Sequence, residues 1–424
     1  MAGAAGSGPS SVVEVPLPSE AAARQAGVFD FARGSGTTVY GALGGSGGTS
    51  GYFGAVALTG AETPDPDFGE GGFTAPLKLP FGGFDNLAPQ AEAIAVAPDG
   101  KLVVAGFSEE GVKEPTEFSP LIARYRADGS LDPGFSGDGI LGKAPQGRGG
   151  TALHDVAVTK AGTILAAGGR DEEGVGAAAP AGVLYAHRPN GKADPAFGEG
   201  GQVLFKGAHR SYYSTLRGVQ VLASGKILVV GYLDSNLLLA RLDADGRLDR
   251  SFGGGDGEVT LDLQSHVCCE DAALGLASGG RIVVAGMGGS FSKYRVFLAR
   301  YSASGKLDRS FGDKGVEADV HPRRLGTLLG MAVQSDGKVV TVGRTEISPA
   351  NRVRSFAVFR NLADGRPDRG FGRDGLYVLK PKTEGIAHAA LALSGGTLLG
   401  GSLLNPEGGG SSPGTSLLLA RLSG

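Results

Sequence analysis

A repeat of about sixty residues limits what this chain can fold into more than any other feature of its sequence. The segment "LARLDADGRLDRSFGG" (239–254) recurs, with variations, from Ile122, Leu298 and Val358. A fixed period in this range is typical of propellers, solenoids and arrays. Aligned on Asp-x-x-Phe, the copies are 55 to 67 residues apart, and their phenylalanines are Phe68, Phe135, Phe197, Phe252, Phe311 and Phe371.

Each period carries the signals for four short strands. From Glu92 to Leu141 the order is an apolar strand, an Asp-Gly turn, a β-branched strand, a variable loop, a third strand, and a short fourth strand after the Phe. The 76 glycines are spread along the 424 residues, which indicates many tight turns. Four strands per period form one propeller blade. The innermost strands precede the first turn of each period, and we expect seven of them, ending near Ala32, Val96, Val158, Val221, Leu276, Val333 and Ala392.

The two ends of the chain complement each other. The chain stops at "LLLARLSG", a third strand with no fourth strand after it, and begins with "VVEVPL" (12–17), which resembles the fourth strands. We therefore predict an all-β, seven-bladed β-propeller with four-stranded antiparallel blades, closed by the N-terminal strand. A β-solenoid is the alternative, but it would not explain the complementary ends. The expected boundaries are a flexible leader over 1–11 and one propeller over 12–424, in which 12–17 completes blade 7 and the blades cover about 22–80, 90–144, 152–207, 214–263, 271–320, 328–380 and 387–424.

The segments "SDGKVVTVG" (335–343) and "ADGRPDRGFGRDG" (363–375) resemble the bacterial delta-sixty repeat. That family is named for its period and is similar in layout to NHL-type propellers. The resemblance extends over residues 12–424, and the first unit, "FDFARGSGTTVYGALGG", departs most from the pattern. It implies a propeller, frequently in an exported or surface protein, and it implies no shared catalytic residues.

Charge and hydropathy exclude several partners. The net charge of −3 and the isoelectric point near 6.1 offer no basic field for nucleic acid. No apolar run has the length of a membrane span. The opening "MAGAAGSGPSS" has neither a basic patch nor a hydrophobic stretch, so we do not expect it to be a signal peptide. We expect a monomer in an extracellular or cell-surface location.

The repeated Asp-rich run is interpreted as a structural joint. Asp243, Asp245 and Asp249 are spaced loosely like a calcium loop, but the copies lack the full set of oxygen ligands. Three features persist in the copies: a turn Gly, the Asp that stands three residues before the Phe (Asp249 in this segment), and the Phe itself. We expect that Asp to accept backbone N–H bonds and the Phe to fill the joint between blades. A recurrent strand arginine is expected to pair with one of these aspartates; the arginines are Arg124, Arg241, Arg300 and Arg421.

Polar residues recur where the innermost strands begin. His154 and His388 stand eight residues before the turn Gly, and Glu92 and Arg217 occupy that position in two other units. Such a ring could hold a metal, bind an anion or transfer protons; we favour the interpretation that a wet channel mouth tolerates polar residues. The fifth position before the turn Gly is interpreted as packing, and it holds Ala95, Ala157, Gln220, Gly275 and Ala332.

The run "SHVCCED" (265–271) contains the only two cysteines, Cys268 and Cys269. Adjacent cysteines can close a strained disulfide ring that stiffens a loop, and a disulfide would suit an oxidising compartment. Reduced, the two thiols could bind a metal together with neighbouring side chains, or they could be inert. We favour the disulfide. The residues that could complete a metal site are His266, Glu270 and Asp271.

These observations favour a binding or interaction module that is not an enzyme and needs no cofactor. The ligand would be a protein, a glycan or another polymer, bound through Tyr212, Tyr213, His266 and Arg217 at the loop-rich end. The absence of Trp weakens the case for a sugar. One alternative is a hydrolase or lyase at the channel mouth, with His154 or His388 as base and Glu92 nearby. The other alternative is a purely structural repeat.

Overall fold

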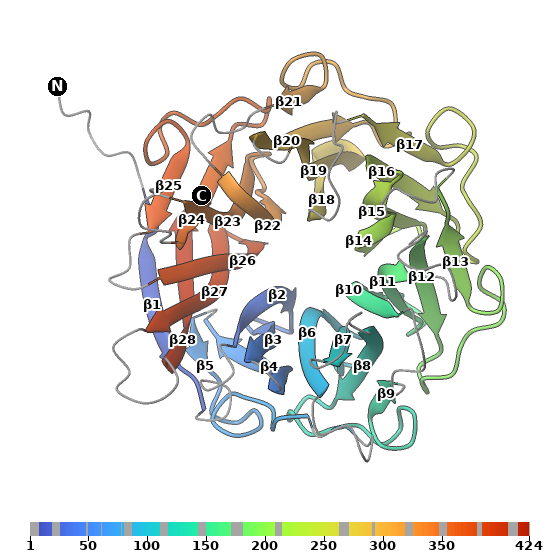
Figure 1. Cartoon of the computed structure of the whole chain (residues 1–424), viewed down its shortest axis with the longest axis vertical. Helices are drawn as coiled ribbons and strands as arrows, with labels where there is room; N and C mark the ends of the chain where they lie inside the picture. Colours follow the sequence, from blue (N-terminus) through green and yellow to red (C-terminus); the bar gives the residue numbers. More distant parts are fainter. Residues whose placement is uncertain are drawn as a thin grey trace.

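Seven four-stranded sheets stand around a central axis in the computed structural model (Figure 1). Neighbouring strands within each sheet are antiparallel, so the predicted seven-bladed all-β propeller is confirmed. Among the residues that the structure describes, no helix has the length and apolar character needed to cross a bilayer. Those residues are 8–18, 26–47, 50–60, 62–77, 79, 87–110, 118–142, 150–170, 181–207, 214–262, 271–290, 293–318, 325–346, 354–379, 384–405 and 414–423.

Each blade is ordered from the channel outward. Blade 1 contains β2 (Gly27–Arg33), β3 (Val39–Gly47), β4 (Ser50–Thr59) and β5 (Thr63–Pro64). Blade 2 contains β6 (Leu87–Val96), β7 (Leu102–Glu110), β8 (Phe118–Tyr125) and β9 (Ile140–Gly142). Blade 3 contains β10 (Thr151–Val158), β11 (Ile164–Arg170), β12 (Ala181–His187) and β13 (Gln202–Phe205). Blade 4 contains β14 (Thr215–Val221), β15 (Ile227–Leu233), β16 (Asn236–Leu242) and β17 (Glu258–Leu261).

The remaining three blades follow the same order. Blade 5 contains β18 (Ala272–Ala277), the short 3-10 turn η1 (Ser278–Gly280), β19 (Arg281–Ser290), β20 (Lys293–Tyr301) and β21 (Val316–Ala318). Blade 6 contains β22 (Leu325–Val333), β23 (Val339–Glu346), β24 (Arg354–Asn361) and β25 (Leu376–Leu379). Blade 7 contains β26 (Glu384–Leu393), β27 (Gly396–Asn405), β28 (Gly414–Ser423) and β1 (Ser11–Pro16).

The first strand of the chain closes the ring. β1 pairs antiparallel with β28, from Ser11 opposite Arg421 to Pro16 opposite Ser416, and lies at the outer edge of blade 7 (Figure 1). Val15 is 4% exposed and packs into the core shared by blades 7 and 1. The predicted completion of the last blade by the N-terminal strand is therefore confirmed. Pairing the two ends of the chain within one sheet leaves no broken seam in the ring.

The core lies between the blades. The described residues form seven clusters of buried apolar side chains, and each cluster is shared by two neighbouring blades. This arrangement holds the seven inner strands in fixed positions around the channel.

The Asp-rich segment from which the repeat was recognised is a joint between blades. In blade 4, Asp249 accepts a hydrogen bond from the Ser251 N–H at 3.0 Å, and the Arg241 Nε lies 2.6 Å from its other carboxylate oxygen. The same guanidinium lies over the Phe252 ring and donates to the carbonyl of Ala303 in blade 5. The backbone bond and the Arg–Asp pair are confirmed here, and the pair is confirmed for Arg124 and Arg300 as well. The pair expected for Arg421 is not found in the described part of the chain, because β1 completes blade 7 and no Asp-x-x-Phe segment follows β28. The pair recurs as Arg124–Asp132, Arg300–Asp308 and Arg360–Asp368.

The Phe of each joint fills the gap to the next blade. Phe252 is fully buried, and the backbone N–H of Gly253 donates to the carbonyl of Ser304 in blade 5 at 3.1 Å. Gly305, in the turn of blade 5, has no room for a side chain because a Cβ there would lie 2.8 Å from the Phe252 ring. Its φ of +81° also favours glycine. The persistent Gly of the repeat is thus required by close approach and by backbone conformation.

Candidate functional site

A register slip in the inner strands places one side chain per blade in the central channel. In six of the seven inner strands, pairing with the second strand skips one residue at the same place, which is a β-bulge. In the described part of β18, the pairing runs without a slip. A bulge turns the skipped side chain away from the regular pleat. The residues skipped at this shared place, which all line one cavity, are Phe29, Glu92, His154, Arg217, Leu329 and His388. β22 has a further slip near its start, between Leu325 and Thr327.

Glycines in the second strand make room for four of these bulges. A Cβ at Gly231 would lie 2.1 Å from the carbonyl oxygen of Thr215, two residues before the skipped Arg217. No side chain tolerates such a distance to backbone. In blade 5, where β18 shows no slip, the equivalent glycine is Gly286. A Cβ added there would approach only side-chain atoms, the nearest being the Leu237 Cδ1 at 2.9 Å. At three other glycines opposite a bulge, an added Cβ would lie 2.0 Å from a backbone carbonyl oxygen; these are Gly106, Gly168 and Gly401.

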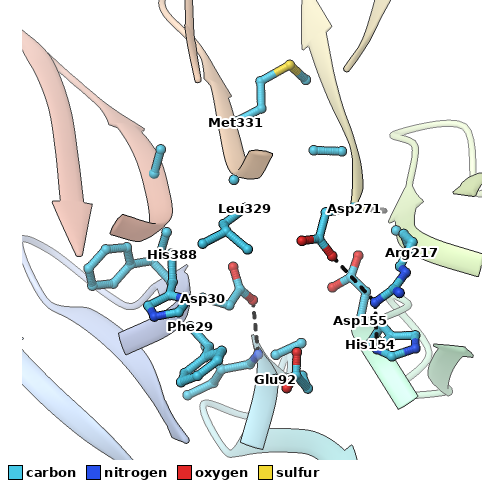
Figure 2. A pocket seen from close by; sticks show the side chains of 18 of the residues that line it. Phe29, Asp30, Glu92, His154, Asp155, Arg217, Asp271, Leu329, Met331 and His388 are labelled. Carbon is cyan, nitrogen blue, oxygen red and sulfur yellow. Dashed lines mark hydrogen bonds and ion pairs between the residues drawn. The ribbon is translucent and has the colours of Figure 1, made fainter. Parts of the chain in front are cut away.

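The cavity has a volume of about 520 Å³ and is lined by all seven blades. That size is within the range of small-molecule sites in proteins. Figure 2 shows side chains of the inner strands converging on it. Among the described residues, no cluster of three or more His, Cys, Asp or Glu side chains is arranged to hold a metal ion.

One side of the cavity is charged. The Arg217 Nη1 lies 3.4 Å from the Asp271 Oδ1 and 3.3 Å from the His154 Nδ1, so one guanidinium connects blades 3, 4 and 5 (Figure 2). Glu92 in blade 2 accepts a hydrogen bond from the Gln90 side-chain amide. The pKa of Glu92 is raised to about 7, first by burial and then by the negative charge of Asp271, while Arg217 and the hydrogen bond from Gln90 oppose the rise. Glu92 is therefore poised to gain or lose a proton near neutral pH.

Two more carboxyl groups lie just beyond the bulges. Asp30 Oδ2 accepts the N–H of Ile94 in blade 2 at 3.0 Å, and Asp155 Oδ2 accepts the N–H of Val219 in blade 4 at 2.7 Å. These N–H groups belong to inner strands whose channel-facing edge has no partner strand. Burial raises the pKa of Asp30 to about 6. Burial, and then the charge of Asp30, raises the pKa of Asp155 to about 8.

The two imidazoles are kept neutral. Burial, and then the positive charge of Arg217, lowers the pKa of His154 well below its ordinary value. Burial, and then Arg344, lowers the pKa of His388 to about 4. His388 stacks on Phe29 of blade 1, with ring centroids 4.2 Å apart and an angle of 24° between the planes. Both side chains are partly exposed to the cavity, and their position inside it limits their contact with bulk water.

The opposite side of the cavity is apolar. Leu329 and Met331 from blade 6 and Leu391 from blade 7 face it, beside the stacked rings of Phe29 and His388. Figure 2 shows Leu329 and Met331 on the side of the cavity away from Glu92. The cavity is thus amphipathic, with carboxyl groups and a guanidinium on one side and hydrocarbon and aromatic groups on the other.

Several residues proposed from the sequence meet in this cavity. Glu92, His154, Arg217 and His388 line it together, and Asp271, considered above as a metal ligand beside the cysteines, reaches it from the residue before β18. Gln220, interpreted as packing, also lines it. The other candidates lie outside the described residues, namely Tyr212, Tyr213, His266, Cys268, Cys269 and Glu270.

Sequence reasoning missed Phe29, Asp30 and Asp155 as lining residues. Two signals could have revealed them. Asp30 and Asp155 are charged residues inside otherwise apolar inner strands, in "VFDFA" and "LHDVAV". In four blades a Gly of the second strand marks the place where the bulge needs room, and so locates the skipped residue opposite it; these glycines are Gly106, Gly168, Gly231 and Gly401.

A family model described as "Domain of unknown function (DUF5122) beta-propeller" matches residues 97–135, 222–252 and 278–311. Each matched segment begins at or next to the first turn of its blade and ends at the Phe of the joint. The match therefore covers the repeated framework, and Glu92, Arg217 and Asp271 lie outside it. A search of curated proteins found no significant match.

Several solved structures are similar to this chain. They include prolyl oligopeptidase B from Galerina marginata, at 12% identity and a TM-score of 0.44, with 95% of this chain and 51% of that one covered. An alpha-L-arabinofuranosidase from Fusarium graminearum is 10% identical, with a TM-score of 0.42 and coverage of 78% and 92%. A Trypanosoma rangeli sialidase mutant displaying trans-sialidase activity is 8% identical, with a TM-score of 0.41 and coverage of 99% and 60%. The chain spans about half the length of the prolyl oligopeptidase.

Proposed function

We propose that this propeller is a binding module that holds a small organic molecule in its central cavity. The observation that carries the proposal is the ring of bulges, which directs one side chain from each of six blades into the same cavity. Bulges that re-aim side chains are common next to functional sites. A purely structural repeat would need no such pocket, and the charged cavity weighs against that alternative.

The burial of ionisable groups also supports a site. Four carboxyl groups with raised pKa values face one cavity: Asp30, Glu92, Asp155 and Asp271. Keeping them there costs folding free energy, because each has less contact with bulk water than in the unfolded chain. Clusters of perturbed groups in a cleft are typical of binding and catalytic sites.

The test is a ligand screen on the full chain. We expect at least one member of a library of amines, carboxylic acids, polyols and nucleotides to raise the melting temperature, with saturable binding by calorimetry. Arg217→Met and Gln220→Ala should weaken that binding. Arg247→Met is the matched control, because the Arg247 side chain is 83% exposed in a turn. Absence of saturable binding, or binding that survives both cavity substitutions, would contradict the proposal.

One observation favours a second candidate, a hydrolase or lyase. Glu92, with its pKa near 7, suits proton transfer at neutral pH better than the two imidazoles, whose lowered pKa values make them weak bases. If this second candidate is right, a ligand found in the screen is converted to product, and Glu92→Gln abolishes turnover even at saturating ligand. Binding without turnover supports the module.

A further inference from the structure

We infer, on the basis of the binding function just proposed, that the cavity selects small organic ammonium ions that carry an apolar body. The first reason is an excess of hydrogen-bond acceptors with acidic character. Asp30, Glu92, Asp155 and Asp271 contribute four carboxyl groups to the lining. Arg217, the guanidinium among the lining residues, is engaged with Asp271 and His154. A ligand that donates hydrogen bonds and carries positive charge complements this wall.

The second reason is Gln220. Its Oε1 is buried and has no hydrogen-bond partner among the described residues, although a buried acceptor normally has one. Gln220 lines the cavity at a position where four other blades carry only a methyl group or a hydrogen and blade 7 carries Leu391. An acceptor placed there without a donor from the protein points to a donor from the ligand. The four small residues at that position are Ala95, Ala157, Gly275 and Ala332.

The third reason is the apolar side. Leu329, Met331 and Leu391 can cover a hydrocarbon chain opposite the acids. Phe29 and the neutral His388 extend this side as a stacked aromatic pair. An ammonium group with a short alkyl chain matches both sides, whereas an inorganic cation would leave the apolar side unused.

Binding of such an ion is linked to protons. Glu92 and Asp155, whose pKa values are about 7 and about 8, hold protons near neutral pH because burial disfavours their charged forms, and Asp30 takes up a proton near pH 6. The cations and imidazoles that face them are Arg217, Arg344, His154 and His388, and both imidazoles are already neutral. An incoming ammonium charge favours the carboxylate, so binding should release a proton and strengthen as pH rises.

Three probes of equal length separate the head groups: hexylammonium chloride, 1-hexanol and sodium hexanoate. We expect hexylammonium to bind in calorimetry, and neither of the others to bind within tenfold of its affinity. Its affinity should rise between pH 6 and pH 8, and the heat should change between buffers of different ionisation enthalpy. Equal binding of 1-hexanol, preferential binding of hexanoate, or binding without proton release would overturn the inference.

Variants connect the effect to the cavity. Glu92→Gln should weaken hexylammonium binding about tenfold or more, as expected for a hydrogen bond to a charged group. Gln220→Ala adopts the residue of neighbouring blades, is expected to fold, and should weaken binding several-fold. Glu14→Gln, on the exposed face of the outermost strand β1, should have no effect. If hexylammonium fails to bind while another library member does so in the cavity, this inference is wrong and the binding function stands.

Discussion

Adding a single methyl group opposite a bulge should destabilise the propeller strongly. At Gly231, a Cβ would lie 2.1 Å from the Thr215 carbonyl oxygen and 2.7 Å from the Leu216 Cα. Both atoms are backbone, so relief requires β14 and β15 to separate or the bulge to straighten. Overpacking of a well-packed interior typically costs 1–3 kcal/mol, and we expect Gly231→Ala to cost about 3 kcal/mol because the clash cannot be relieved by a side-chain rotation.

Gly286→Ala is the matched control. Gly286 occupies the same place in blade 5, but its added Cβ would meet the Leu237 Cδ1 at 2.9 Å, the end of a flexible side chain. We expect a cost of about 1 kcal/mol or less, since only a rotamer must adjust. Equilibrium urea unfolding of the full chain, followed by circular dichroism, measures both changes.

The cavity provides the second measurement. Because Gly231 makes room for the bulge that presents Arg217, Gly231→Ala should also weaken any ligand found by the screen, whereas Gly286→Ala should not. If the two substitutions cost the same free energy of unfolding, or if Gly231→Ala leaves binding intact, the argument that glycine makes room for the bulge is refuted.

Three further predictions concern buried charges. Arg360→Met should lower the free energy of unfolding by about 3 kcal/mol or more, because Asp368 loses its buried partner; Arg360→Met combined with Asp368→Leu should recover much of the loss in urea unfolding. The pKa of Asp155 is about 8 in the folded protein and 3.8 ordinarily, so the folded state retains the proton as pH rises from 4 to 8. Wild type should therefore lose stability relative to Asp155→Asn across that window, by at most about 1.4 kcal/mol per pH unit, and parallel pH profiles would contradict this. The pKa of His388 is about 4 in the folded protein and 6.5 ordinarily, so between these pH values only the unfolded chain takes up a proton. Wild type should therefore lose stability relative to His388→Phe as pH falls from 6.5 to 4. A difference in unfolding free energy that stays constant over this range would contradict the prediction.

The sequence alone determined the architecture. Turn residues and alternating apolar strands are local signals, and their repetition indicated seven blades, while the unmatched strands at the two ends indicated the closure that β1 and β28 make. The joint was also predictable, since Arg241 and Asp249 are eight residues apart and need only one turn to meet. The shared position of Glu92, His154, Arg217 and His388 was visible in the same way, by counting back from each turn.

Only the tertiary structure decided how the cavity is built. Whether the side chain at that shared position points into the channel depends on the bulge, and in four blades a second-strand Gly lets a carbonyl approach there. The contacts of Arg217 with His154 and Asp271, and that of Asp155 with the Val219 N–H, join residues from neighbouring blades that are more than fifty residues apart in the chain. Such contacts leave no local pattern, because they exist only once the closed ring fixes the distance between one blade and the next.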